Sequence, residues 1–443
     1  MNICVFGAGY VGLVQAAVLA HVGHNVLCVE TDPTKRAMLL DGKVPIYEPG
    51  LEGLVQANVV EGRLHFSGEL GDAVRHARIQ FIAVGTPSDA QGAADLSYVH
   101  AVARGIAEAT ETDQLVVNKS TAPVGTADAI HALMEETIRR RGRSDLAIDV
   151  VANPEFLKQG AAVSDCQRPD RIIIGSTNPS SIEVLHELYA PFNRNREKVM
   201  VMDRRSAELT KYAANAFLAT KISFMNEMAN LAELFEADIE MVRKGIGADP
   251  RIGYDFIYPG CGYGGACFPK DVRALKESAS RAGYEAAILQ AVESVNERQK
   301  HKLSAAIRDC YGDDLRGRVF ALWGLAFKAN TGDMREAPSR ALLEDLWRAG
   351  ARVRAFDPEA MPECRRLYGE RPDLELVETK DAALTGADAL VVVTDWQSFK
   401  APDFDLLRSE LKDSQVFDGR NLYDPQMMRR QGLRYHSIGR IPV

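Results

Sequence analysis

The stretch Asn2-Ile3-Cys4-Val5-Phe6-Gly7-Ala8-Gly9-Tyr10-Val11-Gly12 decides the fold of the first part of the chain. Residues 3–6 form a short apolar run typical of a buried parallel strand, and the pattern G-x-G-x-x-G follows at once. We expect an apolar helix over residues 13–22 and a second strand over residues 25–29, followed directly by Glu30. This order of strand, glycine loop, helix, strand and acid is typical of a dinucleotide-binding unit.

Each residue type in this unit has a physical role. Gly7 makes the turn, Gly9 lets a pyrophosphate approach the backbone, and Gly12 packs the helix on the strand. The helix N-terminus, close to Tyr10 and Val11, attracts the pyrophosphate. A carboxylate at position 30 would bind a ribose diol and repel a 2′-phosphate, so Glu30 favours NAD over NADP. Lys35 is a candidate for contact with the adenosine half. The alternative is a strand–helix–strand turn that binds no phosphate.

Three further strands are expected at residues 79–84, 115–118 and 148–152. Polar side chains follow each of them, and ligands bind at the carboxyl ends of strands in doubly wound sheets. Thr86, Thr121 and Glu155 are therefore candidates to line one cleft. For a single threonine, a helix N-cap is the stronger interpretation. For Glu155 the functional and structural interpretations carry equal weight.

A long helix is predicted over residues 204–237, where apolar residues recur at helical spacing. Its length suggests that it connects domains, and its broad apolar surface suggests a dimer interface. Lys211 and Asn215 are four residues apart and share a face. They could contact a substrate, but the pattern alone favours a solvated lysine and a surface asparagine.

The glycine-rich stretch at residues 259–271 ends in Cys267-Phe268-Pro269-Lys270-Asp271, and an apolar-periodic run follows. Proline is favoured at the start of a helix, so Cys267 should lie at a helix N-terminus. The helix dipole and Lys270 both favour a thiolate there, and Asp271 is close enough to act as a base. Cys267 is either a nucleophile or a buried structural cysteine, with about even weight from this stretch alone.

The last third repeats the alternation of strands and helices. Strands are expected at residues 318–322, 353–356, 389–394 and 416–417, with a helix over residues 339–349. This pattern predicts a second doubly wound domain, without G-x-G-x-x-G. The loops after its strands contain Lys328, Arg335 and Arg420, cations suited to the phosphates of a nucleotide sugar. Ordinary surface salt bridges are the alternative for each.

Composition limits the class of protein. The chain has 443 residues, of which 46% are hydrophobic and 26% charged, as in ordinary globular proteins. The net charge of −8 argues against general binding to nucleic acid or anionic membranes. Seven scattered cysteines without a C-x-x-C pair indicate neither a zinc site nor a disulfide framework. No apolar run is long enough to span a bilayer and no signal peptide is evident, so we expect a cytoplasmic protein.

Together these motifs resemble the nucleotide-sugar 6-dehydrogenase family, in particular its branch that acts on UDP-glucose. The resemblance covers nearly the whole chain and includes GAGYVG at 7–12, VGTP at 84–87, KSTAPVGT at 119–126 and NPEFL at 153–157. The more specific motifs are AELTKYAANAFLATKISFMNE at 207–227, GYGGACFPKD at 262–271 and GLAFKANTGDMRE at 324–336. The resemblance implies an α/β fold, with two doubly wound Rossmann-like domains joined by a long central helix. It implies an NAD-binding domain at residues 1–203, a central dimerisation region with the cysteine loop at 204–300, and a UDP-sugar-binding domain at 301–443.

The resemblance also implies a reaction in which UDP-glucose, two NAD+ and water give UDP-glucuronate and two NADH. Cys267 would trap the C6 aldehyde as a thiohemiacetal that is then oxidised to a thioester. Asp271 and Lys211 would act as acid, base and oxyanion stabiliser, and Thr121 and Glu155 would work with a water. The resemblance also implies substrate contacts: Asn215 and residues 256–260 (Phe256, Ile257, Tyr258, Pro259, Gly260) for the sugar and pyrophosphate, Lys328 and Arg420 for UDP, and Phe156, Leu157, Lys158 and Gly264 elsewhere on the substrate. The implied contacts of NAD are Thr86, Thr121, Gln159, Lys270 and Arg335. Arg251 would contact the neighbouring subunit of a homodimer.

One position departs from the family pattern. Gln159 stands where relatives often carry glutamate, so it keeps hydrogen bonding but cannot act as a base. Two alternatives stay open: a dehydrogenase of another nucleotide sugar, such as GDP-mannose or a UDP-N-acetyl sugar, and a non-catalytic nucleotide-sugar sensor. Simple binding needs no thiolate, so Cys267, Lys211 and Asp271 argue against the sensor.

Overall fold

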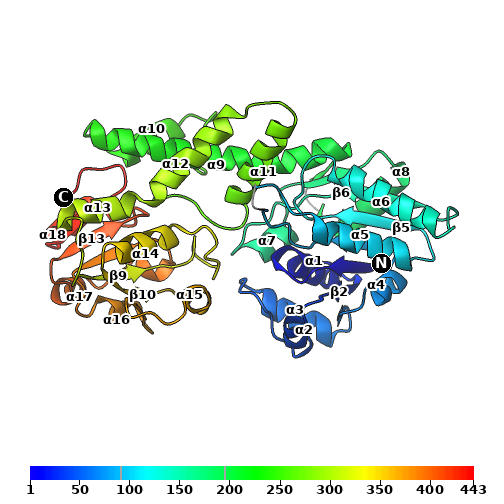
Figure 1. Cartoon of the computed structure of the whole chain (residues 1–443), viewed down its shortest axis with the longest axis horizontal. Helices are drawn as coiled ribbons and strands as arrows, with labels where there is room; N and C mark the ends of the chain where they lie inside the picture. The colour runs from blue at the N-terminus through cyan, green and yellow to red at the C-terminus, as the bar shows by residue number, and fades with distance from the viewer. Residues whose placement is uncertain (90–91, 194–195) are drawn as a thin grey trace. The chain divides into compact units, whose positions relative to one another are not determined.

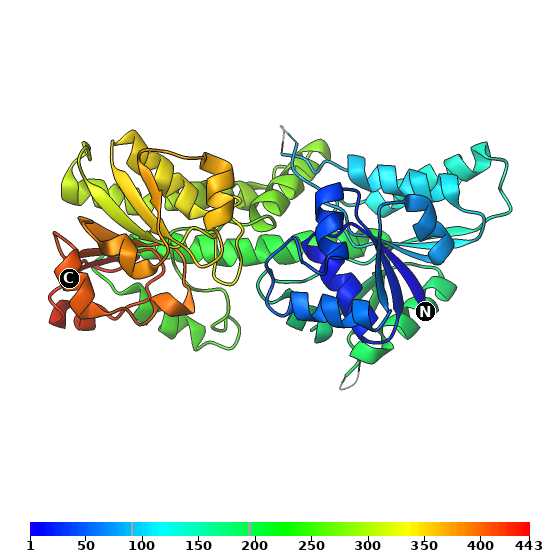
Figure 2. The same ribbon diagram turned by 90° about the horizontal axis from the view of Figure 1, so that it is seen from below.

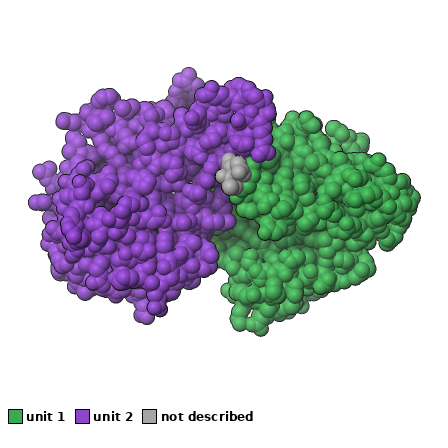
Figure 3. Space-filling view, viewed as in Figure 1, with its two compact units in different colours: residues 1–214 green, residues 215–443 purple. Residues whose placement is uncertain are grey.

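The computed structural model of the protein describes residues 1–89, 92–193 and 196–443. The chain divides into two compact units, Met1–Ala214 and Asn215–Val443, which Figure 3 shows in two colours.

A mostly parallel sheet forms the centre of the first unit (Figure 1). The strand order is β3-β2-β1-β4-β5-β6-β7-β8, and of the paired neighbours only β6 and β7 run antiparallel among the described residues. The strands are β1 (Asn2–Phe6), β2 (Asn25–Val29), β3 (Leu64–Ser67), β4 (Ile79–Ile82), β5 (Gln114–Asn118), β6 (Ile148–Ala152), β7 (Ile172–Gly175) and β8 (Val199–Met202). The order reverses between β1 and β4, which is where doubly wound sheets bind their ligands.

Helices cover both faces of this sheet (Figure 2). Ile3 and Val5 of β1 pack in one apolar cluster, while Cys4 and Phe6 pack in another on the opposite face. This is the alternation of a strand buried on both sides. The helices are α1 (Tyr10–His21), α2 (Pro33–Leu40), α3 (Leu51–Val60), α4 (Leu70–His76), α5 (Ser97–Ala109), α6 (Thr126–Arg140), α7 (Ala162–Gln167) and α8 (Pro179–Tyr189), with a short 3₁₀ turn at Ala190–Phe192.

Helix α9 (Arg204–Leu234) begins in the first unit and continues into the second. It ends three residues before the predicted end, and Glu236 then takes a left-handed backbone conformation with φ 56°. A left-handed residue just past the last turn is a common way for a helix to stop.

The second unit contains a sheet with order β11-β10-β9-β12-β13-β14, whose paired neighbours are parallel. Its strands are β9 (Val319–Trp323), β10 (Arg352–Phe356), β11 (Leu374–Leu376), β12 (Ala389–Val392), β13 (Gln415–Asp418) and β14 (Arg434–Ser437). In chain order this is the same 3-2-1-4-5-6 arrangement as the first six strands of the other sheet, so the predicted fold of two doubly wound domains is confirmed.

Three helices of the second unit lie between α9 and residue 301. These are α10 (Ile239–Gly247), α11 (Phe268–Arg281) and α12 (Ala287–Lys300). The others are α13 (Lys302–Tyr311), α14 (Pro338–Arg348), α15 (Met361–Tyr368), α16 (Lys380–Leu384), α17 (Phe404–Glu410) and α18 (Pro425–Arg430), with a 3₁₀ turn at Gln397–Phe399. Apolar residues of α13 and α14 pack in one cluster with the sheet, and those of α16 and α17 pack in another.

Candidate active site

The glycine loop after β1 has no room for side chains at two of its positions. Gly7 has a φ of +99°, and a Cβ there would lie 2.8 Å from the carbonyl oxygen of Ala83. A Cβ on Gly12 would lie 1.9 Å from the carbonyl oxygen of Gly7. At Gly9, by contrast, no described atom beyond Gly9 and its two chain neighbours lies within 4 Å of the place a Cβ would take. The loop is therefore tightly packed behind and open over the start of α1, a shape that fits a pyrophosphate.

The N-terminus of α1 is the second part of this cradle. Helix α1 begins at Tyr10, three residues before the predicted start, and among the described residues no side chain caps it. The amides of its first turn, which includes Val11, can therefore bind an anion.

Glu30 follows β2 and lies beside the glycine loop. Its Oε2 accepts a hydrogen bond from the Ala8 amide at 3.1 Å, and its Oε1 accepts one from the Asp32 amide at 2.9 Å. The carboxylate is thus fixed at the end of the strand, the position from which an acid reaches a ribose diol. Lys35 lies exposed on α2, where its amide donates to the Asp32 side chain that caps the helix.

The loops after β4 and β5 are joined to each other. The Thr86 hydroxyl donates to the carbonyl oxygen of Thr121 at 2.7 Å. The N-cap interpretation is wrong for both threonines, because each loop runs on before its helix begins: Leu96 is the N-cap residue of α5 and Gly125 that of α6. Gln159 lies partly buried in the turn after β6.

Lys211 and Glu155 form a buried ion pair in the first unit. Lys211 Nζ lies 2.9 Å from Glu155 Oε1, and each side chain is only 4% exposed. Glu155 Oε2 accepts a hydrogen bond from the Leu157 amide at 2.6 Å, and the Phe156 ring centre lies 5.4 Å from Lys211 Nζ. The expectation of a solvated lysine is therefore wrong, because a carboxylate 56 residues away in the chain compensates the buried charge.

Lys158 does not belong to this buried group. Its side chain is 58% exposed and pairs with Asp165 at 3.2 Å.

A second buried lysine, Lys119, was missed by the sequence reasoning. Its Nζ donates to Asn153 Oδ1 at 3.1 Å, and the Tyr189 hydroxyl donates to the same oxygen at 2.5 Å. Burial lowers the pKa of Lys119 to about 8, although Cys166 and Glu155 act in the opposite direction. The Glu155 carboxylate thus interacts with two lysines, Lys211 through a direct ion pair and Lys119 through electrostatic attraction. The motif KST at 119–121 was the available signal.

Glu208 is another residue that the sequence reasoning missed. It precedes Lys211 on α9 by three residues, and its carboxylate accepts hydrogen bonds from the amides of Gly125 at 2.6 Å and Ala127 at 2.7 Å. These amides lie at the N-terminus of α6, so Glu208 anchors the end of the Thr121 loop to α9. Burial raises the pKa of Glu208 to about 7.

Cys267 is the N-cap residue of α11, as predicted, and its side chain is partly buried. Asp271 lies one turn into this helix and is 1% exposed. Its Oδ2 accepts a hydrogen bond from Asn215 Nδ2 at 2.6 Å, and its Oδ1 lies 2.8 Å from Lys270 Nζ. The expectation of a surface asparagine is wrong, because Asn215 is buried by this contact across 56 residues of chain. The second unit thus combines the thiol at the N-terminus of α11, the carboxylate one turn into that helix and the Asn215 amide of α9.

The cysteine loop packs against residues 333–337. The Gly265 amide donates to the Arg335 carbonyl oxygen at 2.7 Å, and a Cβ on Gly264 would lie 2.4 Å from the Glu336 carbonyl oxygen. Burial works to lower the pKa of Arg335, but its hydrogen bonds to Asp333 and its electrostatic interactions with Asp333 and Cys267 outweigh burial and raise it. Glycine at position 264 is what allows the two backbones to approach.

Residues 256–260 form an ordered loop of the second unit. Ile257, Pro259 and Gly260 are buried, whereas Tyr258 is 59% exposed. The Gly260 amide donates to Asn226 Oδ1 at 2.8 Å, and its carbonyl oxygen accepts from Gln299 Nε2 at 2.7 Å. Phe256 has a left-handed φ of 61°, and its ring centre lies 6.4 Å from that of Phe268.

Arg420 connects this region to the second sheet. Its guanidinium donates to the carbonyl oxygens of Val393 at 2.7 Å, Gly262 at 3.2 Å and Phe327 at 3.3 Å. These partners are neutral, so they fix the guanidinium without cancelling its charge. The alternative of an ordinary surface salt bridge is therefore wrong for Arg420, which donates to backbone carbonyl groups instead. Lys328 lies with its Nζ 5.6 Å from the Phe327 ring centre.

Arg251 lies apart from these groups in the loop after α10. Its side chain is 87% exposed and pairs with Asp249 at 2.5 Å.

Within the described parts of the chain, no helix is both long and apolar enough to cross a membrane.

Comparison with known proteins agrees with this architecture. Residues 1–193 match the NAD binding domain of the UDP-glucose/GDP-mannose dehydrogenase family, residues 205–298 its central domain, and residues 321–425 its UDP binding domain. The UDP-glucose 6-dehydrogenase of Pseudomonas aeruginosa is 52% identical, with 99% of this chain and 98% of that protein covered. That of Rhizobium meliloti is 44% identical, with 99% and 100% covered.

Solved structures give the same result. A UDP-glucose dehydrogenase from Pyrobaculum islandicum is 36% identical with a TM-score of 0.90, and the match covers 100% of this chain and 98% of that one. A UDP-D-ManNAc dehydrogenase from Pyrococcus horikoshii is 25% identical with a TM-score of 0.86, and 99% of each chain is covered. The chain therefore belongs to the UDP-glucose/GDP-mannose dehydrogenase family.

Proposed function

We propose that the protein oxidises UDP-glucose and two NAD+ with water to UDP-glucuronate and two NADH, through a covalent bond to Cys267. The observation that carries the proposal is the group on α11: a partly buried thiol at the helix N-terminus, with the Asp271–Asn215 hydrogen bond one turn away. The full-length similarity to UDP-glucose 6-dehydrogenases supports the choice of substrate.

The glycine cradle and Glu30 would hold NAD. The fit rests on the open space at Gly9 and on the position of the Glu30 carboxylate beside the loop. Bound NAD+ supplies a hydride acceptor for each oxidation. Thr86, Thr121, Gln159, Lys270 and Arg335 are further proposed contacts of the cofactor.

Cys267 has the central chemical role. Its thiolate adds to the C6 aldehyde, and the thiohemiacetal keeps the aldehyde from escaping between the two oxidations. Loss of a second hydride leaves a thioester. Water adds to the thioester carbonyl, the thiolate leaves, and the product is a carboxylate. The helix N-terminus favours the thiolate in both its attacking and its leaving role.

The remaining polar groups would handle protons and charge around C6. Lys211, an ammonium held by Glu155, is suited to stabilise an oxyanion. Asp271 is suited to accept a proton, and Asn215 orients its carboxylate. Glu155 and Thr121 would position the hydrolytic water. Gln159 cannot act as a base, so if relatives transfer a proton at that position, this role falls to Glu155 here.

The second unit would bind the nucleotide. Arg420 keeps its charge while three carbonyl groups fix it, a state suited to a phosphate. Residues 256–260, Gly264 and Lys328 would complete the UDP-sugar contacts, and Phe156, Leu157 and Lys158 those from the first unit. We accordingly assign residues 1–203 to NAD binding, 204–300 to the cysteine loop and dimerisation, and 301–443 to UDP-sugar binding.

We also propose a homodimer, in a cytoplasmic setting where thiols stay reduced. Phe217 and Phe224 are 65% and 51% exposed on α9, and their spacing of seven residues puts them on one face. Arg251 extends into solvent and would reach the neighbouring subunit. Light scattering on a Phe217→Asp, Phe224→Asp variant should give the monomer mass, and an unchanged mass would argue against this face.

The decisive assay counts NADH formed per nucleotide sugar consumed, with UDP-glucose, GDP-mannose and UDP-N-acetylmannosamine offered separately. We expect two NADH per UDP-glucose. Two NADH from another sugar would keep the mechanism and change the substrate. One NADH with free aldehyde would show that Cys267 is not the trap, and binding without NADH would indicate a sensor. In Cys267→Ser we expect turnover to collapse and an ester or aldehyde-level species to accumulate, because an oxygen ester hydrolyses slowly. Normal turnover of that variant would refute the mechanism.

A further inference from the structure

The side chain of Glu336 links residues 333–337 to two helices of the second unit. Its Oε1 accepts a hydrogen bond from Arg273 Nη2 of α11 at 2.7 Å, and its Oε2 accepts one from Lys300 Nζ of α12 at 3.0 Å. Lys300 is only 5% exposed. Burial alone would raise the pKa of Glu336, but the two cations hold it at about 2. The charged Glu336 side chain therefore links residues 333–337 to α11, the helix that begins beside Cys267, and to α12.

The backbone of Glu336 gives an independent sign that the residue is under constraint. Its φ is 52°, in the left-handed region that a residue with a side chain seldom adopts. Such a conformation costs free energy and persists where the surroundings hold it in place. The ion pairs with Arg273 and Lys300 are contacts able to do so.

This anchored segment is also the one that packs on the cysteine loop. The Gly265 amide donates to the Arg335 carbonyl oxygen, and the Glu336 carbonyl oxygen lies only 2.4 Å from the place that a Cβ on Gly264 would take. The Arg335 side chain interacts electrostatically with Cys267 and is itself bonded to Asp333. A shift of the segment would therefore move a cation relative to the thiol.

We propose that Glu336 is a positioning residue, whose ion pairs with Arg273 and Lys300 hold Arg335 where its guanidinium stabilises the Cys267 thiolate. The inference deepens the proposed function, since it assumes that Cys267 reacts as a thiolate. It extends the thiol's setting beyond α11, whose Lys270 and Asp271 also carry charge near it. Other acidic groups of the described residues next to this network are Asp333, 2.6 Å from Arg335, Glu293, 3.9 Å from Arg273, and Glu297, 2.7 Å from Lys300.

The test is the pH dependence of Cys267 alkylation by iodoacetamide in the full-length protein, read by mass spectrometry of the peptide that contains this cysteine. Glu336→Gln should raise the midpoint by about one pH unit, which lowers the thiolate fraction near neutral pH about tenfold. A more basic thiolate is also more reactive, so the net rate should fall about threefold. A direct field effect predicts the opposite sign, because removing a carboxylate and leaving two cations favours a nearby thiolate.

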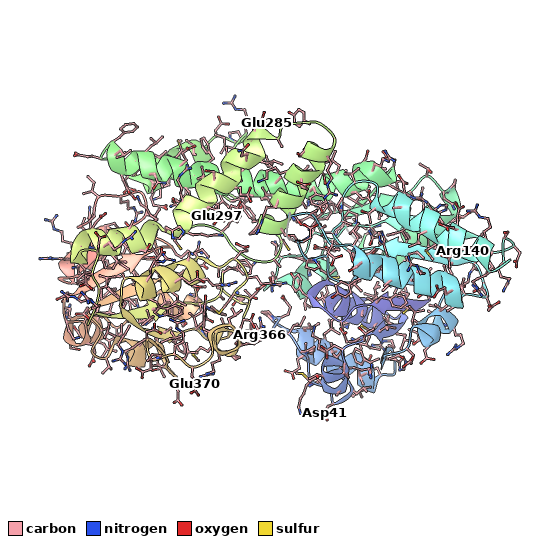
Figure 4. All side chains as sticks on the ribbon, viewed as in Figure 1. Asp41, Arg140, Glu285, Glu297, Arg366 and Glu370 are labelled. Carbon is pink, nitrogen blue, oxygen red and sulfur yellow. The ribbon has the colours of Figure 1, made fainter. Side chains whose placement is uncertain are left out.

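Two further variants keep the result interpretable. Arg335→Gln should raise the midpoint as Glu336→Gln does, and the double variant should raise it no further, because both act through one guanidinium. Glu297→Gln is the matched control: Glu297 pairs with the same Lys300 but is 58% exposed on α12 and labelled in Figure 4. Its midpoint should stay at the parent value.

A lowered or unchanged midpoint in Glu336→Gln would overturn the proposal, as would additive shifts in the double variant or an equal shift in Glu297→Gln. If Glu336→Gln fails to fold, Arg335→Gln still decides, since an unchanged midpoint there removes the cation from the argument. Alkylation needs neither substrate nor turnover. A failure of the proposed reaction, seen as normal turnover of Cys267→Ser, is therefore distinguishable from a failure of this inference.

Discussion

The buried pair of Lys211 and Glu155 predicts a large and asymmetric effect on stability. In Lys211→Met the Glu155 carboxylate would lose a partner at 2.9 Å while staying almost fully buried. Breaking a buried ion pair from one side costs about 3–5 kcal/mol. The Leu157 amide and the attraction of Lys119 still support the carboxylate, so we expect the low end, about 3 kcal/mol.

The assay is urea unfolding followed by circular dichroism, with the variant Lys211→Met, Glu155→Gln as comparison. At a slope of about 3 kcal/mol per M, the single variant should lose about 1 M in its unfolding midpoint. In the double variant no charge is left buried without a partner, so stability should return to within about 1 kcal/mol of the parent. Both variants should lack turnover, which separates stability from chemistry.

Two results would refute this reasoning. The first is a Lys211→Met variant as stable as the parent protein, which would mean that the carboxylate protonates or is hydrated at little cost. The second is a double variant no more stable than the single one, which would mean that packing of the lysine chain, not its charge, accounts for the loss.

Further predictions concern pH and the cofactor cradle. Because the pKa of Glu208 is raised to about 7 from its ordinary 4.5, the folded state holds the proton longer than the unfolded state. The free energy of unfolding should therefore fall by up to about 3 kcal/mol as pH rises from about 4.5 to about 7. Glu208→Gln should remove this part of the pH dependence. Parallel curves of stability against pH for parent and variant, measured by urea unfolding, would contradict this prediction. Gly9→Ala should leave the melting temperature nearly unchanged but weaken NAD binding more than about tenfold by calorimetry, because the added methyl group occupies only ligand space. Gly12→Ala should lower both the melting temperature and the affinity for NAD, because its Cβ would collide with the Gly7 carbonyl oxygen. Equal melting temperatures for the two variants would argue against the cradle.

Local patterns predicted the fold well because the decisive signals lie within short windows. The strand over residues 25–29 and that over 148–152 have the predicted bounds, and Cys267 begins its helix where proline and glycine indicated. Strands β3, β7, β8, β11 and β14 were missed. Strands β7 (IIIG) and β8 (VMVM) are short apolar runs that periodicity alone does not distinguish from helix segments, and β8 is a partly exposed edge strand.

The polar contacts of the candidate site were harder to predict, because each joins distant parts of the chain. The sequence favoured a solvated Lys211 and a surface Asn215, because their partners Glu155 and Asp271 are distant in the chain. Glu336 has its two cations 63 and 36 residues away. A helical pattern reports which face is apolar, but it cannot report which distant charge meets a lysine or a carboxylate.

The continuity of α9 has a consequence for how this chain can change by insertion and deletion. Glu208, Lys211 and Asn215 bond to three separate segments of the chain from one uninterrupted helix. Each residue of an α-helix turns the chain by about 100°, so removing one residue between Lys211 and Asn215 would turn Asn215 by about 100° relative to Glu208 and Lys211. The length of this helix between residues 208 and 215 is therefore not free to vary.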